Sequence, residues 1–324
     1  MSDESNDRPP ANNSTPSAVV GIGASAGGLE ALERFFSTVA DDSGLAYIIL
    51  QHVDPAGSDA LHESLRKFTC LPVVRIGEST RLEPNTAYVS PAHSSIACTN
   101  GEVKSVKLDD AKQRATSVDR FLQSLADAAE RRAIGVILSG AGADGTLGLK
   151  AIADAGGMTL AQDADSAQYD SMPGNAAATG VVDHVLPPEK MPSEIVAYAR
   201  HIDGLQEEHG PASWNAVESV LPNICNVLLK ETEHDFKHYK SSTLVRRVLR
   251  RIQIRRIASA EQYLKLIQED QDETQLLFRE LLIGVTSFFR DPDTFSTLAE
   301  MVLPKLFENR AVDEPVRVWV PGCA

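Results

Sequence analysis

The chain has 324 residues, of which 43% are hydrophobic and 23% are charged. This length and composition allow two globular domains with separate cores, and they exclude fibrous and wholly disordered proteins. No apolar run reaches the roughly 18 residues that a membrane-spanning helix needs, and the polar N-terminus lacks the basic and apolar regions of a signal peptide. We therefore expect a cytoplasmic protein without membrane insertion.

The net charge of −14 is unevenly distributed along the chain. Residues 1–210 hold 16 Lys and Arg against 29 Asp and Glu, whereas residues 211–324 hold 15 against 16. The acidic excess excludes nucleic acid as a partner of the first part. The 4 cysteines are far apart and form no C-x-x-C pair, so neither a metal site nor a disulfide framework is expected.

Short β-branched runs that alternate with helical stretches predict βαβ units and a parallel sheet. Residues 1–16 are polar and are expected to form a disordered tail. The expected strands are residues 18–23, 46–50, 72–76, 86–90, 133–139 and 158–162. Residues 117–132 carry apolar side chains at helical spacing, with Ser117 as N-cap. Residues 17–202 are therefore expected to form an α/β domain with a doubly wound, mostly parallel sheet.

The pattern changes after a polar, breaker-rich stretch at residues 203–214, which we interpret as a linker. Residues 215–308 contain long helical patterns and few strand-like runs, and this predicts an all-α domain. Residues 309–324 end in VRVWVPGCA, a strand pattern followed by a glycine turn. We interpret this segment as the start of a second α/β domain that is truncated in this chain.

The first predicted strand runs into the sequence VVGIGASAGGLEAL, which fits two different turns. Gly21, Gly23 and Ala26 match the G-x-G-x-x-G/A turn that holds a dinucleotide pyrophosphate, whereas the G-x-S-x-G spacing around Ser25 matches a turn that exposes a nucleophilic serine. Dinucleotide binding also requires an acid at the end of the second strand. His52 stands there instead. A base is what a nucleophilic serine requires, so this position favours catalysis.

A third candidate residue, Asp144, lies in the turn GAGADG after the strand at 133–139. In open parallel sheets, ligands bind beyond the carboxyl ends of the strands, where Ser25, His52 and Asp144 are expected to converge. There Asp144 would orient the imidazole of His52, which takes the proton of Ser25. N–H groups at the start of the helix that follows Ser25 are candidates to hold an oxyanion. They belong to Ala26, Gly27 and Gly28.

Each of these features also has a structural reading without chemistry. Glycine-rich turns between strands and helices are common, His52 fits a hydrogen-bonded turn histidine, and Asp144 fits the cap of a helix that begins near Gly145. Together, the structural readings require three residue types to coincide at three strand ends. We therefore favour a catalytic triad, which uses no metal.

Residues 17–200 resemble the catalytic domain of CheB, the chemotaxis protein-glutamate methylesterase, in the stretches VVGIGASAGGLEAL, IILQH, SVDRFLQSLA, GVILSGAGADGTLGLKAI, AGGMTLAQD and SMPGNA. The resemblance implies that Ser25 is the nucleophile, His52 the base and Asp144 its orienting acid. It implies hydrolysis of glutamate methyl esters on chemoreceptor helices without a cofactor, and in some members glutamine deamidation. Two features depart from the family pattern: Ala141 replaces a common Met, and the loop SPAHSSIAC has no clear match.

The second part resembles the N-terminal helical domain of the chemoreceptor methyltransferase CheR, in FKHYKSSTLVRRVLRRIQIRR and ELLIGVTSFFRDPDTF. VWVPGCA is similar to the opening of the motif that receives S-adenosylmethionine. The resemblance implies that Thr286 and Arg290 lie near that cofactor, which only the complete methyltransferase part would bind. Together the two parts resemble a CheB–CheR fusion whose methyltransferase is incomplete in this chain.

The basic stretch at residues 237–256 holds eight Lys or Arg and no acid. An apolar stripe along it predicts a helix with one buried face and outward-facing arginines. Uniform positive charge costs self-repulsion unless an acidic partner relieves it. The family resemblance implies that receptor methylation regions are glutamate-rich helices, so we expect this face to dock them. A solvated face without a partner is the alternative. The docking residues are expected to be Arg246, Arg247, Arg250 and Arg251.

Two other functions stay open on the sequence alone. A non-catalytic scaffold of a bacterial signalling complex would have no trappable Ser25. An oxidoreductase that uses a dinucleotide would bind nucleotide in a simple titration.

Overall fold

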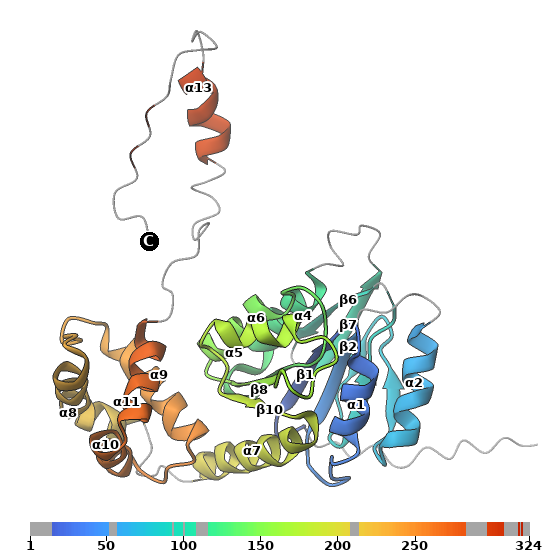
Figure 1. The fold of residues 1–324 in the computed structure, drawn as a ribbon, viewed down its shortest axis with the longest axis horizontal. Helices are drawn as coiled ribbons and strands as arrows, with labels where there is room; N and C mark the ends of the chain where they lie inside the picture. The colour runs from blue at the N-terminus through green and yellow to red at the C-terminus, as the bar shows by residue number, and fades with distance from the viewer. Residues whose placement is uncertain are drawn as a thin grey trace, which may run out of the picture. The chain divides into compact units, whose positions relative to one another are not determined.

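The computed structural model describes residues 15–51, 57–92, 94–99, 101–107, 116–207, 214–282 and 297–307, together with Arg317 and Trp319. Backbone contacts group the chain up to Leu281 into one compact unit and the chain from Leu282 onward into a second. The first unit contains an α/β region within residues 15–207 and a helical region within residues 214–281 (Figure 1).

The α/β region is built on a seven-stranded sheet in which the paired strands are parallel. Its strands, in spatial order, are β10 (His184–Leu186), β9 (Met158–Gln162), β8 (Ala133–Ile137), β1 (Val19–Ala24), β2 (Ala46–Gln51), β5 (Thr86–Val89) and β3 (Val73–Arg75). The chain proceeds from β1 to β2 on one side and later adds β8 on the other side. The strand order therefore reverses at β1, and the predicted doubly wound sheet is confirmed.

Helices cover both faces of this sheet (Figure 1). The core of one face contains Leu32, Phe35 and Tyr47, all fully buried. The helices that contribute to this core are α1 (Gly28–Phe36), α2 (Gly57–Phe68) and α7 (Met191–Glu207), which follows the short η2 (Pro188–Lys190). On or near the other face are α4 (Ser117–Ala129), η1 (Glu130–Arg132), α5 (Thr146–Asp154) and α6 (Ser171–Ala178).

The glycines of β1 mark the place where a helix approaches the sheet most closely. A Cβ atom on Gly23 would lie 2.4 Å from Cγ1 of Val118, and one on Gly21 would lie 2.7 Å from Cδ2 of Leu125. Both contacted residues are on α4, so a larger residue at either position would push that helix away from the sheet. Gly21 and Gly23 thus lie inside a strand and under a helix. They do not form the pyrophosphate turn that a dinucleotide site requires.

A second sheet is absent from the sequence-based prediction. Its antiparallel strands, in spatial order, are β4 (Thr80–Arg81), β7 (Glu102–Lys107) and β6 (Ser94–Thr99). All but the last residue of β6 lies within the stretch SPAHSSIAC, which we expected to be a loop. Buried Ser94, Ile96 and Cys98 alternate along it with more exposed residues, and the N–H of Cys98 donates to Oγ of Ser124 on α4 at 3.0 Å. The packing of α4 against β6 thus stabilises a strand of weak intrinsic pattern.

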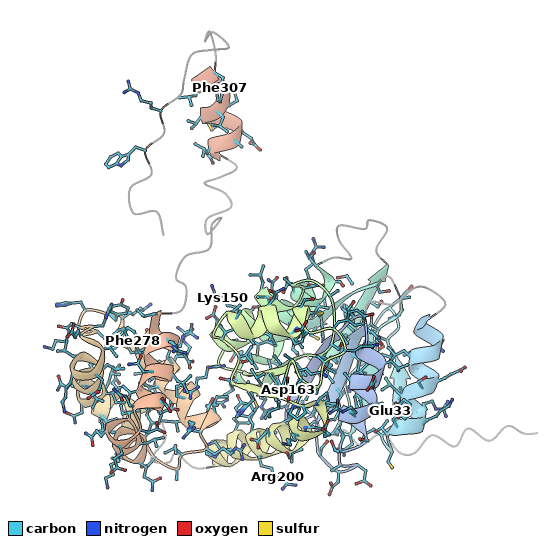
Figure 2. All side chains as sticks on the ribbon, in the orientation of Figure 1. Glu33, Lys150, Asp163, Arg200, Phe278 and Phe307 are labelled. Atoms are coloured by element: carbon cyan, nitrogen blue, oxygen red, sulfur yellow. The ribbon has the colours of Figure 1, made fainter. Side chains whose placement is uncertain are left out.

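The helical region confirms the predicted all-α class within residues 214–282. Its helices are α8 (Trp214–Thr232), α9 (Ser241–Ile254), α10 (Ala260–Glu269) and α11 (Gln271–Leu282). Most of the predicted apolar stripe of α9 is buried, with Val245, Val248 and Ile252 fully inaccessible. An aromatic group extends this core, where the ring of Phe278 lies 6.1 Å from that of Phe236 (Figure 2).

Three boundaries differ from the predicted ones. Pro16 is buried although it belongs to the predicted tail, and α7 continues through Glu207 into the predicted linker. The compact unit that contains the helical region ends at Leu281 rather than near residue 308. At the end of the predicted tail, the N–H of Ser17, next to Pro16, donates to the carbonyl oxygen of Gly44 at 3.0 Å, so a distant part of the chain holds this segment.

The second unit is described only in part. It contains the π-helical turn η3 (Leu298–Val302) and the short α13 (Leu303–Phe307). The predicted start of another α/β domain at residues 309–324 lies almost entirely outside the described residues and stays a prediction. Across the ranges that the structure describes, no helix combines the length and apolarity needed to cross a membrane.

Candidate active site

The strands β1, β2 and β8 end at the same edge of the central sheet. β1 pairs in parallel with β2 and with β8, and the register sets Ala24 opposite Gln51 and Gly23 opposite Ile137. Because the carboxyl ends of parallel strands share one edge, the residues that follow β1 and β8 lie close together. Ser25 follows β1, and the loop that carries Asp144 follows β8. His52 follows Gln51 in the sequence but lies outside the described residues.

Ser25 stands in a sharp turn that neighbouring strands hold from both sides. Its N–H donates to the carbonyl oxygen of Ser139 at 3.0 Å. Its own carbonyl oxygen accepts from the N–H of Gly28 at 2.9 Å and from Nε2 of Gln51 at 3.4 Å. A Cβ on Gly140 would lie 2.9 Å from Cβ of Ser25, so the loop after β8 touches the serine side chain. The structure therefore brings the Ser25 turn against the loop of Asp144.

The three N–H groups expected to bind an oxyanion differ in whether they already donate a hydrogen bond. The N–H of Gly28 is already used inside the turn, because it donates to the carbonyl oxygen of Ser25. The expectation that Gly28 offers a free donor is therefore wrong. The N–H groups of Ala26 and Gly27 have no acceptor among the described residues, and Gly27 has the left-handed φ of 72° that glycine tolerates best. These two groups stay as candidate donors.

Asp144 is buried and holds the start of a neighbouring helix. Its Oδ2 accepts from the N–H of Val118 at 3.0 Å, and its Oδ1 accepts from the N–H of Asp119 at 2.9 Å. It thereby caps α4, a task that we expected Ser117 to perform. The alternative interpretation, that Asp144 caps a helix, is correct. The helix that it caps is α4, however, and not α5 as expected. A carboxylate has four acceptor sites, so these two bonds do not by themselves exhaust its ability to accept hydrogen bonds.

A reciprocal bond closes this cluster. Oδ1 of Asp119 accepts from the N–H of Gly148 at 2.8 Å, so Asp119 on α4 caps α5 while Asp144 before α5 caps α4. Burial raises the pKa of Asp119, and the negative charge of Asp144 adds to this effect. The exchange of caps locks the two helices to each other and fixes the position of Asp144 at the start of α4.

Some predicted residues are not described by the structure. His52, Thr286 and Arg290 lie outside the described ranges, so their predicted roles stay predictions. Among the described residues, no group of three His, Cys, Asp or Glu side chains is arranged to hold a metal ion.

The four arginines of the predicted docking face do not share one orientation. Arg246 is exposed, but Arg247 is mostly covered, and Arg250 and Arg251 are only 4% and 5% exposed. The expectation that all four face outward is therefore wrong for three of them. Oδ1 of Asp154, at the end of α5, lies 2.5 Å from Nη2 of Arg247.

Arg250 and Arg251 lie in a buried network of charges between the two regions. Nη2 of Arg250 is 2.7 Å from Oδ2 of Asp183 in the α/β region, and its Nη1 is 2.9 Å from Oε1 of Glu280 on α11. Nη2 of Arg251 is 2.7 Å from Oε2 of Glu273, also on α11. The sequence-based expectation considered acids only within the basic stretch itself. Carboxylates brought by tertiary packing neutralise these arginines instead.

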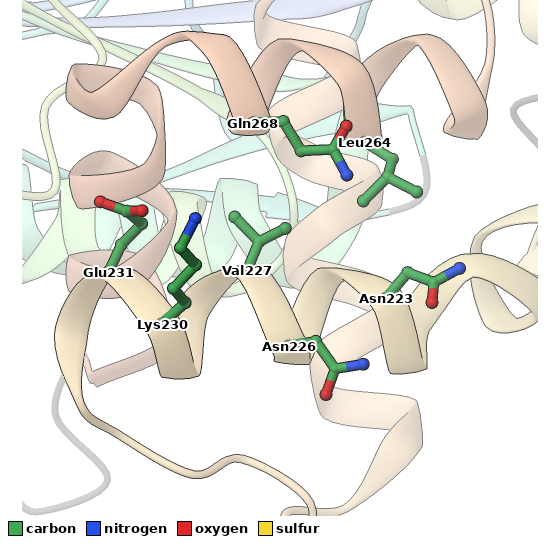
Figure 3. A pocket seen from close by; sticks show the side chains of 7 residues that line it. All are labelled: Asn223, Asn226, Val227, Lys230, Glu231, Leu264 and Gln268. Carbon is green, nitrogen blue, oxygen red and sulfur yellow. The ribbon is translucent and has the colours of Figure 1, made fainter.

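The helical region also contains a groove of about 520 Å³ between α8 and α10 (Figure 3). The residues that line it are Asn223, Asn226, Val227, Lys230, Glu231, Leu264 and Gln268. None of these side chains is a serine, cysteine or histidine, and the carboxylate of Glu231 accepts from Nε2 of Gln271 at 3.5 Å. The groove therefore lacks the residue types that the predicted nucleophile and base require.

Two residues that contact or support the Ser25 turn were not predicted from the sequence. Ser139 was expected only as the last residue of a strand, and Gln162 only as part of the next one. The structure shows both buried beneath the nucleophile turn, where Oε1 of Gln162 accepts from the N–H of Ser139 at 2.8 Å. A polar residue at the carboxyl end of a strand predicted to be fully buried is the signal that could have identified them.

Two protein families match successive parts of the chain. The family described as CheB methylesterase matches residues 20–195, which is more than half of the chain. The chain belongs to this family. The all-alpha domain of CheR methyltransferase matches residues 221–282, which end at the last residue of α11. Both family resemblances predicted from the sequence are confirmed.

Individual relatives agree with this assignment. A protein-glutamate methylesterase/protein-glutamine glutaminase of Paramagnetospirillum magneticum is 34% identical over 170 residues, which are 52% of this chain and 48% of that protein. An uncharacterized 104.1 kDa protein of Rhodobacter capsulatus is 34% identical over 281 residues, or 80% of this chain and 29% of that protein. The chain thus spans less than half the length of these relatives.

A solved structure supports the fold of the α/β region. The crystal structure of the Thermotoga maritima CheB methylesterase catalytic domain superposes with a TM-score of 0.51 at 27% sequence identity. The similarity covers 55% of this chain and 97% of that domain. The α/β region therefore corresponds to an almost complete CheB catalytic domain.

Proposed function

We propose that this chain hydrolyses γ-methyl esters of glutamate side chains on the helices of chemoreceptor-type signalling proteins. Membership of the CheB methylesterase family and the name of the Paramagnetospirillum relative support this substrate class. The observation that carries the proposal is the turn at Ser25. It sits at the reversal point of the sheet, touches the loop of Asp144, and is followed by two N–H groups without an acceptor among the described residues.

The proposed reaction has two stages. Oγ of Ser25 attacks the ester carbonyl while His52 takes the serine proton, and the N–H groups of Ala26 and Gly27 stabilise the oxyanion. The ester C–O bond breaks, and methanol leaves with the proton held by His52. Water then attacks the acyl carbon and passes a proton to His52, which returns that proton to Oγ of Ser25 as the bond from the acyl carbon to Oγ breaks. The glutamic acid that is released loses its own proton to water. Asp144 stabilises the imidazolium in both stages. A glutamine substrate would follow the same path with ammonia as leaving group.

The experiment is an assay of methanol release from methyl-esterified receptor signalling helices. Ser25→Ala and His52→Gln should each lower the rate on the order of 10⁴-fold, and the double variant should be scarcely slower because the residues act as a unit. Additive losses would contradict the triad. Chelators should leave the rate unchanged, because the proposed proton transfers need no metal. A protein that binds these helices but never releases methanol would be a scaffold instead.

S-adenosylmethionine has no role in this reaction. We propose that it is used only by the methyltransferase part of a longer protein, whose expected contacts include Thr286 and Arg290. Of the predicted docking arginines, Arg246 alone is exposed in the part of the chain that the structure describes, so we propose no receptor dock on that face.

A further inference from the structure

Ser139 makes hydrogen bonds to two different loops and to the end of β9 although it never reaches the surface. It follows β8 by two residues and is fully buried. Its carbonyl oxygen accepts from the N–H of Ser25 at 3.0 Å, and its N–H donates to Oε1 of Gln162 at 2.8 Å. Its hydroxyl oxygen lies 2.9 Å from the carbonyl oxygen of Ala26 and accepts from the N–H of Tyr169 at 3.0 Å. The residue therefore joins the nucleophile turn to the loop after β9.

The hydroxyl proton has one preferred acceptor. The carbonyl oxygens of Ala26 and Tyr169 lie 2.9 Å and 3.4 Å from Oγ of Ser139. A serine hydroxyl carries a single proton, so the shorter contact to Ala26 takes it, and the N–H of Tyr169 occupies an acceptor site. The hydroxyl of Ser139 is thus oriented by one hydrogen bond that it accepts and one that it donates.

This bond determines where an oxyanion donor points. The carbonyl of Ala26 and the N–H of Gly27 belong to one peptide unit, which is planar and trans, so the two groups point in opposite directions. A hydroxyl that holds the carbonyl inward therefore directs the N–H of Gly27 outward. The approach is close, because a Cβ on Gly27 would lie 2.7 Å from Oγ of Ser139. The other face of the turn is held by the bond from the N–H of Ser25 to the Ser139 carbonyl.

We propose that Ser139 is a positioning residue for ester hydrolysis: its hydroxyl orients the Ala26–Gly27 peptide so that the N–H of Gly27 meets the developing oxyanion. The inference rests on the proposed esterase function. Ser139 is inaccessible and touches no substrate, so it acts only through the peptide. Gln162 supports it from below, since Nε2 of Gln162 donates to the carbonyl oxygen of Ser166 at 2.9 Å and thereby fixes the amide that receives the Ser139 N–H.

The test compares kcat and KM of Ser139→Ala with those of the unaltered chain on a glutamate γ-methyl ester peptide. Loss of one oxyanion donor lowers kcat by about 10²–10³-fold, so misdirection of one donor should lower kcat by roughly 10–100-fold. KM should change less than about threefold, because the donor acts in the transition state. Ser139→Thr, which keeps the hydroxyl, should restore most of kcat. Ser139→Cys, with similar volume and a weak S–H donor, provides the same comparison should Ser139→Ala not fold.

A matched control separates positioning from general loosening of the core. Thr159 is also fully buried, and its hydroxyl donates to the carbonyl oxygen of Val181 at 2.6 Å, away from the nucleophile turn. Thr159→Val should lower the melting temperature but leave kcat unchanged. A second readout uses the thionoester analogue, whose sulfur accepts hydrogen bonds poorly, so the loss caused by Ser139→Ala should shrink on it.

The outcomes distinguish this inference from the proposed function. If the unaltered chain releases no methanol, the esterase function fails before Ser139 is tested. If the chain is active and Ser139→Ala keeps full kcat, the positioning role is wrong. An equal loss of kcat in Thr159→Val, or an equal loss on ester and thionoester, would also overturn it.

Discussion

At the scale of single residues, Asp144 combines a structural task with its proposed catalytic one. Both of its oxygens accept backbone N–H groups at the start of α4, and Asp119 returns a similar bond to α5. Helix caps of this kind contribute about 1–2 kcal/mol to stability. A substitution at Asp144 therefore changes stability and rate together, and activity alone cannot separate the two effects.

The first prediction uses the reciprocal cap as a control. Asp144→Ala and Asp119→Ala should each lower the free energy of unfolding by about 1–2 kcal/mol, because each leaves helix N–H groups without their acceptor. Only Asp144→Ala should also lower ester hydrolysis, on the order of 10⁴-fold. Urea denaturation and methanol release on the same preparations check both effects. Equal rate losses in the two variants would mean that Asp144 acts only as a cap.

At the scale of elements, α9 is held by charges as well as by its apolar stripe. Arg250 bridges Asp183 in the α/β region and Glu280 in the helical region, and its Nε donates to the carbonyl oxygen of Gly157 at 3.0 Å. A buried ion pair is weak evidence for net stability, because desolvation offsets much of its attraction. Removal of one partner is different, since it leaves buried charges without compensation.

The second prediction follows from this asymmetry. Arg250→Met should lower the free energy of unfolding by about 3–5 kcal/mol, because two buried carboxylates lose their nearest cation. Arg246→Met is the matched control: it lies on the same helix and is exposed, so its effect should stay within about 0.5 kcal/mol. Urea unfolding followed by circular dichroism measures both. A similar loss in the two variants would contradict the assigned burial.

The third prediction concerns two histidines of the α/β region whose pKa values are influenced by arginines of the helical region. Burial lowers the pKa of His184 on β10 and of His201 on α7, and the Nε2 atom of each is buried without a partner among the described residues. For His184, Asp183 and Glu194 oppose this effect, whereas Arg256 and Arg251 strengthen it. Arg256 also lowers the pKa of His201. Both rings are thus held in their neutral form by the folded chain.

The sign of the pH dependence follows from linkage. The unfolded histidines have pKa values of about 6.5, above those of the folded state, so below that pH the unfolded state binds more protons. The contribution of these two histidines to the free energy of unfolding is therefore fully present above about pH 6.5. It is lost as the pH falls toward the pKa values that the histidines have in the folded chain. Urea midpoints at pH 7.5 and 5.5 should differ less in the variant with His184→Gln and His201→Gln. An unchanged difference would refute the prediction, and His238→Gln, at an exposed site, is the control.

At the scale of the whole molecule, the α/β and helical regions share core as well as charges. Ile254, the last residue of α9, is 6% exposed and belongs to the hydrophobic core of the α/β region. Arg247 and Arg256 add ion pairs with Asp154 and Glu194 across the same boundary. These contacts explain why the chain up to Leu281 forms one compact unit although two families match it.

The fourth prediction uses the thiols as reporters of each region. Burial raises the pKa of Cys98 in the α/β region to about 12, and it also raises the pKa of Cys225 on α8. At pH 8 the thiolate fraction of Cys98 should be lower than that of an ordinary thiol by about a thousandfold. Iodoacetamide should therefore modify the exposed Cys70 long before Cys98 or Cys225, as peptide mass spectrometry would show. Early modification of Cys98 would contradict the packing of β6 against α4.

The main sheet and the nucleophile turn were predictable because their signals are local. Runs such as AYIIL and MTLAQ bury both faces of a strand, and the G-x-S-x-G spacing at Ser25 is visible in a few residues. The short strands β4, β6, β7 and β10 escaped prediction because their residues become strands only by pairing and by packing against α4 or β9. Propensity over two to six residues is too weak to decide that alone.

The sequence by itself determined the order of the elements, the α/β and all-α classes, the families, and the candidate residues Ser25 and Asp144. Tertiary structure alone decided which side each polar group faces. It brought Arg250 and Arg251 to buried carboxylates and placed the hydroxyl of Ser139 against the Ala26 carbonyl of the Ser25 turn. The physical reason is that a buried charge or hydrogen-bonding group needs a partner, and these partners lie 20 to more than 100 residues away along the chain.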